Sequence, residues 1–125
     1  GIDGYDLVLL DLPLGPVPAL PCRLLTIVNA DANCHVRLHR HAWAAGELLL
    51  VTQFSSRRAL QQDLLDLWQA GGLPLLNLRL HRDEAMAEAM AAKLPVGRHA
   101  PASLIAHELM TLASWCLGEG GETSC

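Results

Sequence analysis

The stretch Tyr5-Asp6-Leu7-Val8-Leu9-Leu10-Asp11-Leu12-Pro13-Leu14-Gly15-Pro16 is the natural starting point for predicting the fold. The apolar run Leu7–Leu10 ends in an aspartate, and turn residues follow at once. A short apolar run bounded in this way predicts a fully buried strand of a parallel sheet. Ligands bind beyond the carboxyl ends of such strands, so we expect Asp11 at a ligand site, where an aspartate can hold the magnesium of a triphosphate. We expect Gly15 to let the backbone approach the ligand. The simpler interpretation is a buried strand whose last residue starts a turn.

Composition predicts one globular domain. The chain has 125 residues, of which 51% are apolar, and this is enough for a substantial core. A net charge of -4 argues against nucleic-acid binding, which needs a basic face. The four cysteines are widely spaced and form no C-x-x-C pair, which fits a reduced, cytosolic protein. Because Gly1-Ile2-Asp3-Gly4 leads almost at once into a predicted buried strand, we expect the chain to be a piece of a longer protein.

The rest of the chain alternates between strand and helix patterns. Strands are predicted at residues 24–28, 48–53 and 74–80, and helices at about 31–43, 55–70, 83–94 and 101–116. Asp31 is an expected helix cap, Ser55 or Ser56 is expected to cap the next helix, Asp83 or Arg82 is expected to begin the third, and Pro101 is an expected first helical residue. Strands alternating with helices predict an α/β domain with a mainly parallel sheet flanked by helices. We expect residues 1–118 to form it and 119–125 to be a disordered polar tail.

Histidines suggest a metal site that their surroundings do not favour. His35 and His39 are four residues apart on a predicted helix, with Cys34 and His41 nearby. Zinc would need further ligands from elsewhere in the fold, and two arginines stand among these histidines and would repel a cation. The alternative, which we favour, is a polar and partly exposed helix face.

The segment His81-Arg82-Asp83-Glu84 is the densest group of titratable residues, at a predicted strand-to-helix junction. It can line a ligand pocket, with N–H groups of the helix start as donors, or it can be a capped helix with a solvated first turn. A nucleophilic triad of Ser55, Ser56 or Ser103 with this segment would lack the G-x-S-x-G elbow. The chain contains no G-x-x-x-x-G-K-[ST] loop and no G-x-G-x-x-G, so we do not expect it to cradle a triphosphate alone.

Several segments together resemble one family. Asp11-Leu12-Pro13-Leu14-Gly15 and His81-Arg82-Asp83-Glu84-Ala85-Met86-Ala87-Glu88 resemble the BcsQ (YhjQ) cellulose-biosynthesis family, which belongs to the MinD/ParA-like ATPases. Asn29-Ala30-Asp31-Ala32-Asn33-Cys34-His35 and Leu112-Ala113-Ser114-Trp115-Cys116 also match, in the same order. The resemblance covers nearly the whole chain but only the C-terminal half of the family. It implies a P-loop fold that lacks the phosphate-loop strand.

The resemblance also implies roles for residues. Asp11, Pro13 and Gly15 match the D-x-P-x-G switch, in which the aspartate holds the magnesium shell and the glycine senses the terminal phosphate. Thr52-Gln53 falls where relatives often have an asparagine that reads adenine, and Thr52 departs from that pattern. His81, Arg82, Asp83 and Glu84 match the segment beside base and ribose. The implied cofactors are ATP and Mg2+.

The function implied for the full-length family is ATP-dependent support of cellulose secretion. Such proteins form ATP-bound dimers and act in the cytoplasm, recruited to the cellulose synthase complex of the inner membrane, so membrane contact would be indirect through partners. Without the phosphate-binding loop we expect no hydrolysis by this chain alone. The missing central strand leaves unpaired edges, so we expect a homodimer or a strand-exchanged dimer. The alternatives are a non-catalytic interaction module and a small α/β hydrolase.

Overall fold

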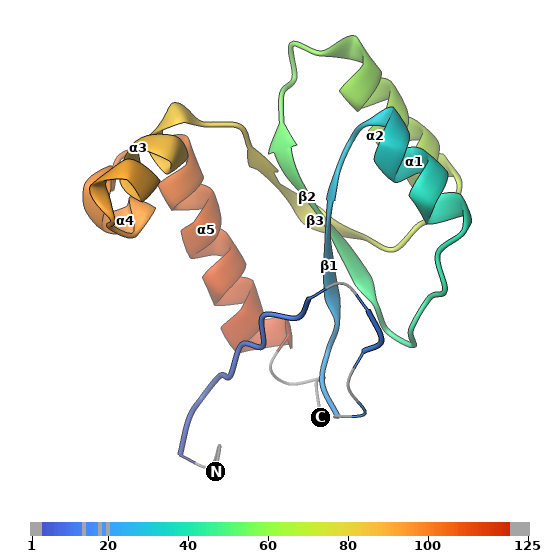
Figure 1. Ribbon diagram of the computed structural model, residues 1–125, viewed down its shortest axis with the longest axis horizontal. Coiled ribbons are helices and arrows are strands. Elements are labelled where there is room, and N and C mark those ends of the chain that lie inside the picture. Colours follow the sequence, from blue (N-terminus) through green and yellow to red (C-terminus); the bar gives the residue numbers. More distant parts are fainter. Residues whose placement is uncertain (1–3, 14, 18, 20, 121–125) are drawn as a thin grey trace.

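The computed structural model describes residues 4–13, 15–17, 19 and 21–120. It is an α/β domain built on a parallel sheet, as the sequence predicts (Figure 1). In chain order the elements are β1 (Leu25–Asn29), α1 (Ala32–His39), β2 (Leu48–Phe54), α2 (Ala59–Ala70), β3 (Leu75–His81), α3 (Glu84–Ala92), α4 (Val96–His99), α5 (Leu104–Trp115) and a π-helical turn (Cys116–Gly120).

The sheet has the strand order β1-β2-β3, and both pairings are parallel. β1 and β2 pair without interruption from Leu25↔Leu48 to Asn29↔Thr52. The register between β2 and β3 shifts twice, the second time between Val51 and Phe54. β2 is therefore the central strand, and all three strands deliver their carboxyl ends to one edge of the sheet.

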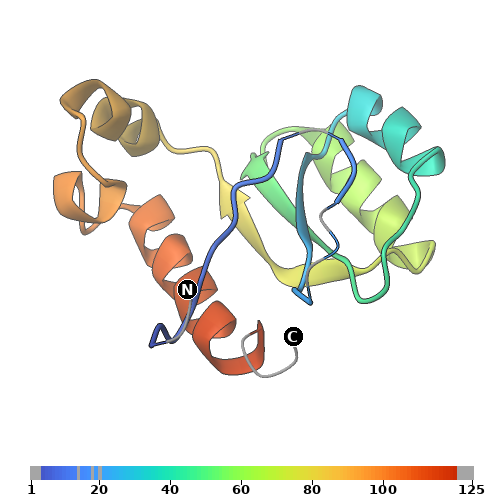
Figure 2. The ribbon, with the colours of Figure 1, turned by 60° about the horizontal axis from the view of Figure 1, so that its bottom comes forward.

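Helices cover both faces of the sheet (Figures 1 and 2). α1 and α2 lie on one face, where Leu38, Leu64 and Trp68 pack with Leu49 and Val51 of β2. Leu50 lies between these two residues of β2, and its side chain is on the other face, where α3, α4 and α5 pack around it. This alternation along β2 is the period of two that a strand buried on both sides requires.

The first predicted strand is absent. Leu7–Leu10 is irregular, and its four side chains are between 36% and 77% exposed. A strand is stabilised by ladder hydrogen bonds, and no strand in the part of the chain that the structure describes pairs with this run. Its local pattern is strand-like, but the partner that would bury it is not among the described residues.

Helix ends agree with the prediction at two caps and differ at three other sites. The Asp31 carboxylate accepts the Cys34 N–H (2.7 Å) and Asp83 caps α3 as expected. α2 begins at Ala59 after Arg58, so neither serine caps it. α1 ends at His39, short of the predicted end near residue 43, because the chain turns at residue 40. α5 starts after Ser103, whose hydroxyl caps it, so Pro101 is not its first residue.

The buried side of α2 is formed by Leu64, Leu65 and Trp68, while Leu60 and Leu67 are exposed. These three buried residues face the sheet, which leaves Leu67 beside α1 on the molecular surface.

No helix in the described ranges is long and apolar enough to cross a bilayer. Residues 121–125 of the predicted tail lie outside the description.

Candidate functional site

A polar pocket of about 180 Å³ lies at the carboxyl edge of the sheet. It is formed where each of the three strands ends and the following segment begins. Its lining residues are Asn29, Asp31, Gln53, Ser55, Arg58, Gln61 and Arg82. Open α/β sheets bind ligands at this edge, so its position alone makes it the candidate site.

The end of β2 is shaped by an unusual backbone. Gln53 has φ of 52°, a left-handed conformation that is uncommon for a residue with a side chain. It falls within the second register shift, where three residues of β2 advance against two of β3. Such irregularities re-aim side chains, and Gln53 lines the pocket. Beside it the Thr52 hydroxyl donates to the Asn29 amide oxygen (3.0 Å), which fixes the ends of β1 and β2 together.

Two arginines give the pocket its charge. Arg58 comes from the turn before α2 and Arg82 from the end of β3. Among the described residues neither guanidinium has a hydrogen-bond or ion-pair partner, whereas the Arg82 backbone N–H donates to the Phe54 carbonyl (2.9 Å). One acid, Asp31, lines the same pocket and caps α1. The pocket therefore has two arginines without described partners and one carboxylate that already accepts a hydrogen bond, and this balance favours an anionic, polar ligand.

The segment His81–Glu84 contributes only one residue to this pocket. The His81 backbone N–H and Nδ1 both contact the Glu108 carboxylate of α5, at 3.0 and 2.7 Å. Asp83 accepts the N–H groups of Ala85 (2.9 Å) and Ile105 (3.2 Å), so it links the starts of α3 and α5. Glu84 is an exposed first-turn residue of α3. Only Arg82 lines the pocket, and its two predicted neighbours His81 and Asp83 organise the C-terminal helices.

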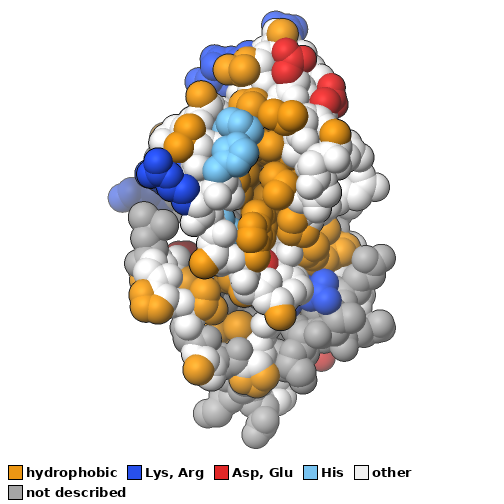
Figure 3. All heavy atoms as spheres, turned by 90° about the vertical axis from the view of Figure 1, so that its right-hand side faces the viewer, with side chains coloured by type: hydrophobic (Ala, Val, Ile, Leu, Met, Phe, Trp, Pro, Cys, Tyr) orange, Lys and Arg blue, Asp and Glu red, His pale blue; other side chains and the backbone are white. Residues whose placement is uncertain are grey.

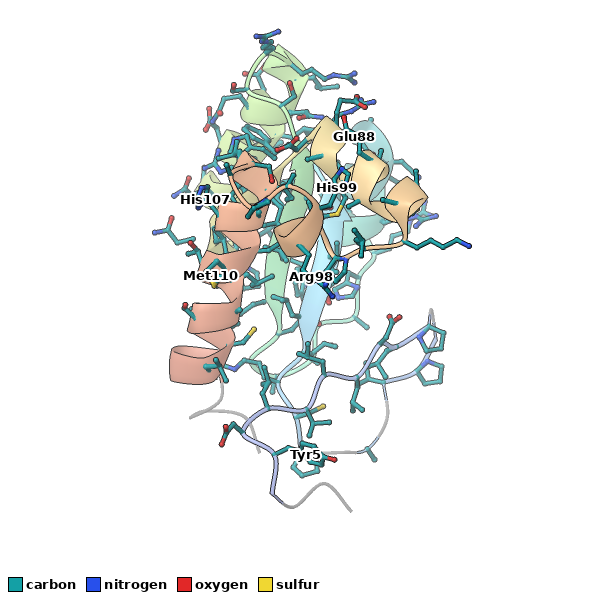
Figure 4. The ribbon with its side chains drawn as sticks, turned by 90° about the vertical axis from the view of Figure 1, so that its left-hand side faces the viewer. Tyr5, Glu88, Arg98, His99, His107 and Met110 are labelled. Atoms are coloured by element: carbon teal, nitrogen blue, oxygen red, sulfur yellow. The ribbon has the colours of Figure 1, made fainter. Side chains whose placement is uncertain are left out.

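The other predicted ligand residues lie apart from the pocket. Asp11, Pro13 and Gly15 are exposed, and none of them lines it. The described N-terminal segment runs past the end of the sheet where the strands begin, and Figure 4 shows Tyr5 at the end of the molecule opposite α3 and α4. In this chain the two halves of the predicted nucleotide site are therefore not brought together.

Among the residues that the structure describes, neither a serine triad nor a histidine metal site is assembled. His81 faces Glu108, and no serine bonds to it in the described chain. His35 accepts the Trp68 indole N–H at Nδ1 (3.0 Å), which places a neutral ring's proton on Nε2, the atom beside His39. Within the described residues no three His, Cys, Asp or Glu side chains are grouped as metal ligands.

A buried acid at the opposite edge of the sheet is a feature the sequence did not suggest. Glu47, just before β2, accepts hydrogen bonds from the Thr26 hydroxyl (2.7 Å), His41 Nε2 (2.6 Å) and the Ala44 N–H (3.0 Å). Burial raises the pKa of Glu47, but the bonds from Ala44, Thr26 and His41 outweigh it and hold the pKa below its usual value. The carboxylate thus fixes the loop between α1 and β2 rather than forming a reactive site.

Sequence reasoning missed most of the pocket. Asn29, Asp31, Ser55, Arg58 and Gln61 were not predicted as ligand residues. The available signal was position, because all of them except Gln61 follow the end of a predicted strand within five residues, much as Asp11 follows the apolar run. The carboxyl-edge rule applied to every strand would have found the region, although not which side chains turn inward.

A parallel sheet with helices on both faces and a polar, cationic pocket at its carboxyl edge makes this chain an α/β domain. Within that class, the chain belongs to the family described as cellulose biosynthesis protein BcsQ, which matches residues 2–117.

Curated relatives agree with this assignment. The chain is 44% identical over 119 residues to the cellulose biosynthesis protein BcsQ of Salmonella typhi, covering 90% of this chain and 48% of that protein. It is 43% identical over 119 residues to the protein of that name from Escherichia coli K12, with the same coverage of both chains. The chain thus spans about half the length of the curated relatives it matches.

Proposed function

We propose that this chain is the carboxyl-terminal half of a MinD/ParA-like ATPase that supports cellulose secretion, and that its carboxyl-edge pocket holds the base and ribose side of ATP. The observation that carries this proposal is the convergence of Gln53 and Arg82 with the unpaired Arg58 at that edge. Gln53 offers an amide that both donates and accepts, as recognition of a base edge requires. The arginines supply the cationic side for a polyanion.

The size of the pocket suits part of a ligand. Complete sites for small molecules typically measure about 300–1,000 Å³, whereas this pocket measures about 180 Å³. A half-site explains the difference, since the phosphate-binding loop of such ATPases comes from a segment that this chain does not contain. We therefore propose that the chain does not hydrolyse ATP alone.

The proposed magnesium at Asp11 needs donors from elsewhere. Asp11 is exposed, and the described residues contain no ligand cluster around it. Magnesium is usually held by one or two carboxylates together with waters and substrate phosphates. Asp11 fits as one such carboxylate, with Pro13 and Gly15 shaping the turn after it. The phosphates and the remaining half of the protein would supply the other donors.

In the cell we propose a cytoplasmic protein that is recruited to the inner membrane by components of the cellulose synthase complex. The relatives are named as cellulose biosynthesis proteins. We further propose a homodimer or strand-exchanged dimer, supported by the edge position of β1 and by the exposed Ile27 on its uncovered side. A clean monomer in light scattering with a well-protected β1 in hydrogen exchange would contradict the dimer.

Calorimetric titration of this chain with Mg-ATP tests the pocket. We expect weak binding that Arg82→Ala and Gln53→Ala each reduce at least roughly five-fold, as the loss of one charged or polar contact predicts. Glu84→Ala is the matched control, since Glu84 is close in sequence and exposed outside the pocket. Equal effects of all three variants would refute this site. In the longer chain, Asp11→Ala should abolish magnesium-dependent ATP binding, and unchanged turnover would exclude the role of Asp11.

A second function, a non-catalytic interaction module, is favoured by the apolar residues exposed near the N-terminus. Tyr5, Leu9 and Val17 are all exposed in one short segment. A partner could cover this segment without any nucleotide. If Mg-ATP produces neither heat nor a thermal shift with this chain, the module becomes the better description.

A further inference from the structure

A second cavity, unrelated to the carboxyl-edge pocket, lies in the groove between α1 and α2. It measures about 360 Å³ and is lined by His35, Leu38, His39, Leu67, Trp68, Gly71 and Leu73. None of these residues lines the carboxyl-edge pocket. Figure 3 shows the groove as a furrow of hydrophobic side chains bordered by histidine. We propose that it binds a small aromatic molecule of one or two rings that carries a hydrogen-bond acceptor.

The walls of the groove suit a flat apolar ring. Trp68 and Leu38 are buried beneath it, and Leu67 forms a wall that is 54% exposed. The His35 ring is stacked on the Trp68 indole, with centroids 6.4 Å apart and planes 14° from parallel. Gly71 and Leu73, just after α2, complete the lining beside Leu67. The volume is at the lower end of the range for small-molecule sites, which limits the ligand to one or two rings.

A chain of hydrogen bonds fixes what the histidines can offer. The indole N–H of Trp68 can only donate, so His35 Nδ1 must accept at 3.0 Å. A neutral His35 then has its proton on Nε2, which faces His39 Nε2 at 3.2 Å. His39 must accept there, which leaves its own proton on Nδ1.

Of the groups in this series of hydrogen bonds, the Nδ1–H of the exposed His39 is the one with no acceptor among the described residues. No described residue accepts from His39 Nδ1, and His39 lines the groove. A bound ring that carries a carbonyl or carboxylate would satisfy it while the ring covers Leu67 and Leu38. A mostly apolar lining with a small number of polar groups is the usual composition of a small-molecule site. The same chain disfavours a metal, because Nε2 of His35 is a donor and not a lone pair.

Nitrogen-15 NMR of the chain tests this proposal, with indole-3-carboxylate as the probe and indole as the analogue without an acceptor. We expect saturable shifts of the Trp68 indole N–H and of the two imidazoles. Leu67→Arg should abolish them by filling the groove from an exposed position. Met110→Arg is the matched control, because Met110 is 70% exposed and projects from α5 on the other side of the sheet (Figure 4).

The acceptor is tested separately. His39→Ala should weaken indole-3-carboxylate roughly five-fold or more and leave indole within about two-fold, as the loss of one hydrogen bond predicts. Equal weakening of both probes would overturn the role of His39. The site itself would be overturned by no shifts at millimolar probe, or by shifts that persist in Leu67→Arg, which would place the probe on other exposed apolar side chains such as Tyr5, Leu9 and Val17.

Discussion

Two apolar runs of identical composition differ in burial in this molecule, since one is buried and the other is exposed. Leu7-Val8-Leu9-Leu10 and Leu48-Leu49-Leu50-Val51 each contain three leucines and one valine. The second run forms the central strand, with Leu49, Leu50 and Val51 no more than 4% exposed. The first is irregular and largely exposed. The difference shows that an apolar run is buried only where neighbouring strands complete its hydrogen bonds and helices cover its faces.

The largest expected effect on stability comes from replacing one leucine in each run by alanine. Leu49→Ala should lower the free energy of unfolding by about 2–5 kcal/mol, because Leu49 is fully buried between the sheet and α2. Leu9→Ala should change it by less than about 0.5 kcal/mol, as is usual for exposed residues. Urea denaturation measures both. Comparable losses would mean that the first run is packed after all.

The next effect concerns what holds the central run in place. Glu47 precedes it and accepts three hydrogen bonds, so Glu47→Gln should cost about 1–3 kcal/mol at pH 7. The pKa of Glu47 is lower in the folded chain than in the unfolded chain. Its contribution is therefore full above the unfolded pKa and is lost as pH falls through the folded one.

Urea midpoints of the wild type and Glu47→Gln at several pH values measure this dependence. The two midpoints should differ at pH 7 and converge as the solution is acidified below about pH 4, near the usual glutamate pKa. Asp66→Asn on the surface of α2 is the control, and its midpoint should stay close to wild type throughout. A gap that widens on acidification would contradict the sign of the shift.

A smaller effect is expected where the central run ends. Gln53 has a left-handed backbone, so Gln53→Gly should stabilise the fold by up to about 1 kcal/mol while removing the side chain from the pocket. Stability should therefore rise as Mg-ATP binding falls. Thermal melts and calorimetry on one preparation measure both. A variant that loses stability would show that the Gln53 side chain is held by contacts that outweigh the backbone strain.

The smallest effect on the stability of this chain is expected from a polar substitution in the first apolar run, residues 7–10. Leu9→Ser should leave the stability of this chain unchanged within about 0.5 kcal/mol. In a chain of the relatives' full length we expect the same substitution to be clearly destabilising, because residues 7–10 would then form the predicted strand. Hydrogen exchange of residues 7–10 in both chains gives the independent measurement. Absence of protection in the longer chain would refute that strand.

The sequence predicted the elements that local patterns encode. All three strands of the sheet and both aspartate caps were located, because alternation and capping are local signals. The pocket was predicted only as an edge of the sheet, and of the residues predicted to bind ligand Gln53 and Arg82 line it. His81 and Asp83 were assigned to ligand, but Glu108 and the start of α5 engage them, and that pairing spans more than 20 residues of chain. Such contacts depend on how helices pack, which no local pattern encodes.

The outer edge of β1 has a consequence for how much of this protein a cell can hold. In the described part of the chain β1 pairs only with β2, so those of its backbone N–H and C=O groups that point away from β2 form an open edge near the exposed Ile27. An open edge of this kind templates aggregation and marks a chain for chaperones and proteases. The steady-state abundance of this chain should then follow the supply of whatever covers β1, so the edge would act as a stoichiometric control on its accumulation.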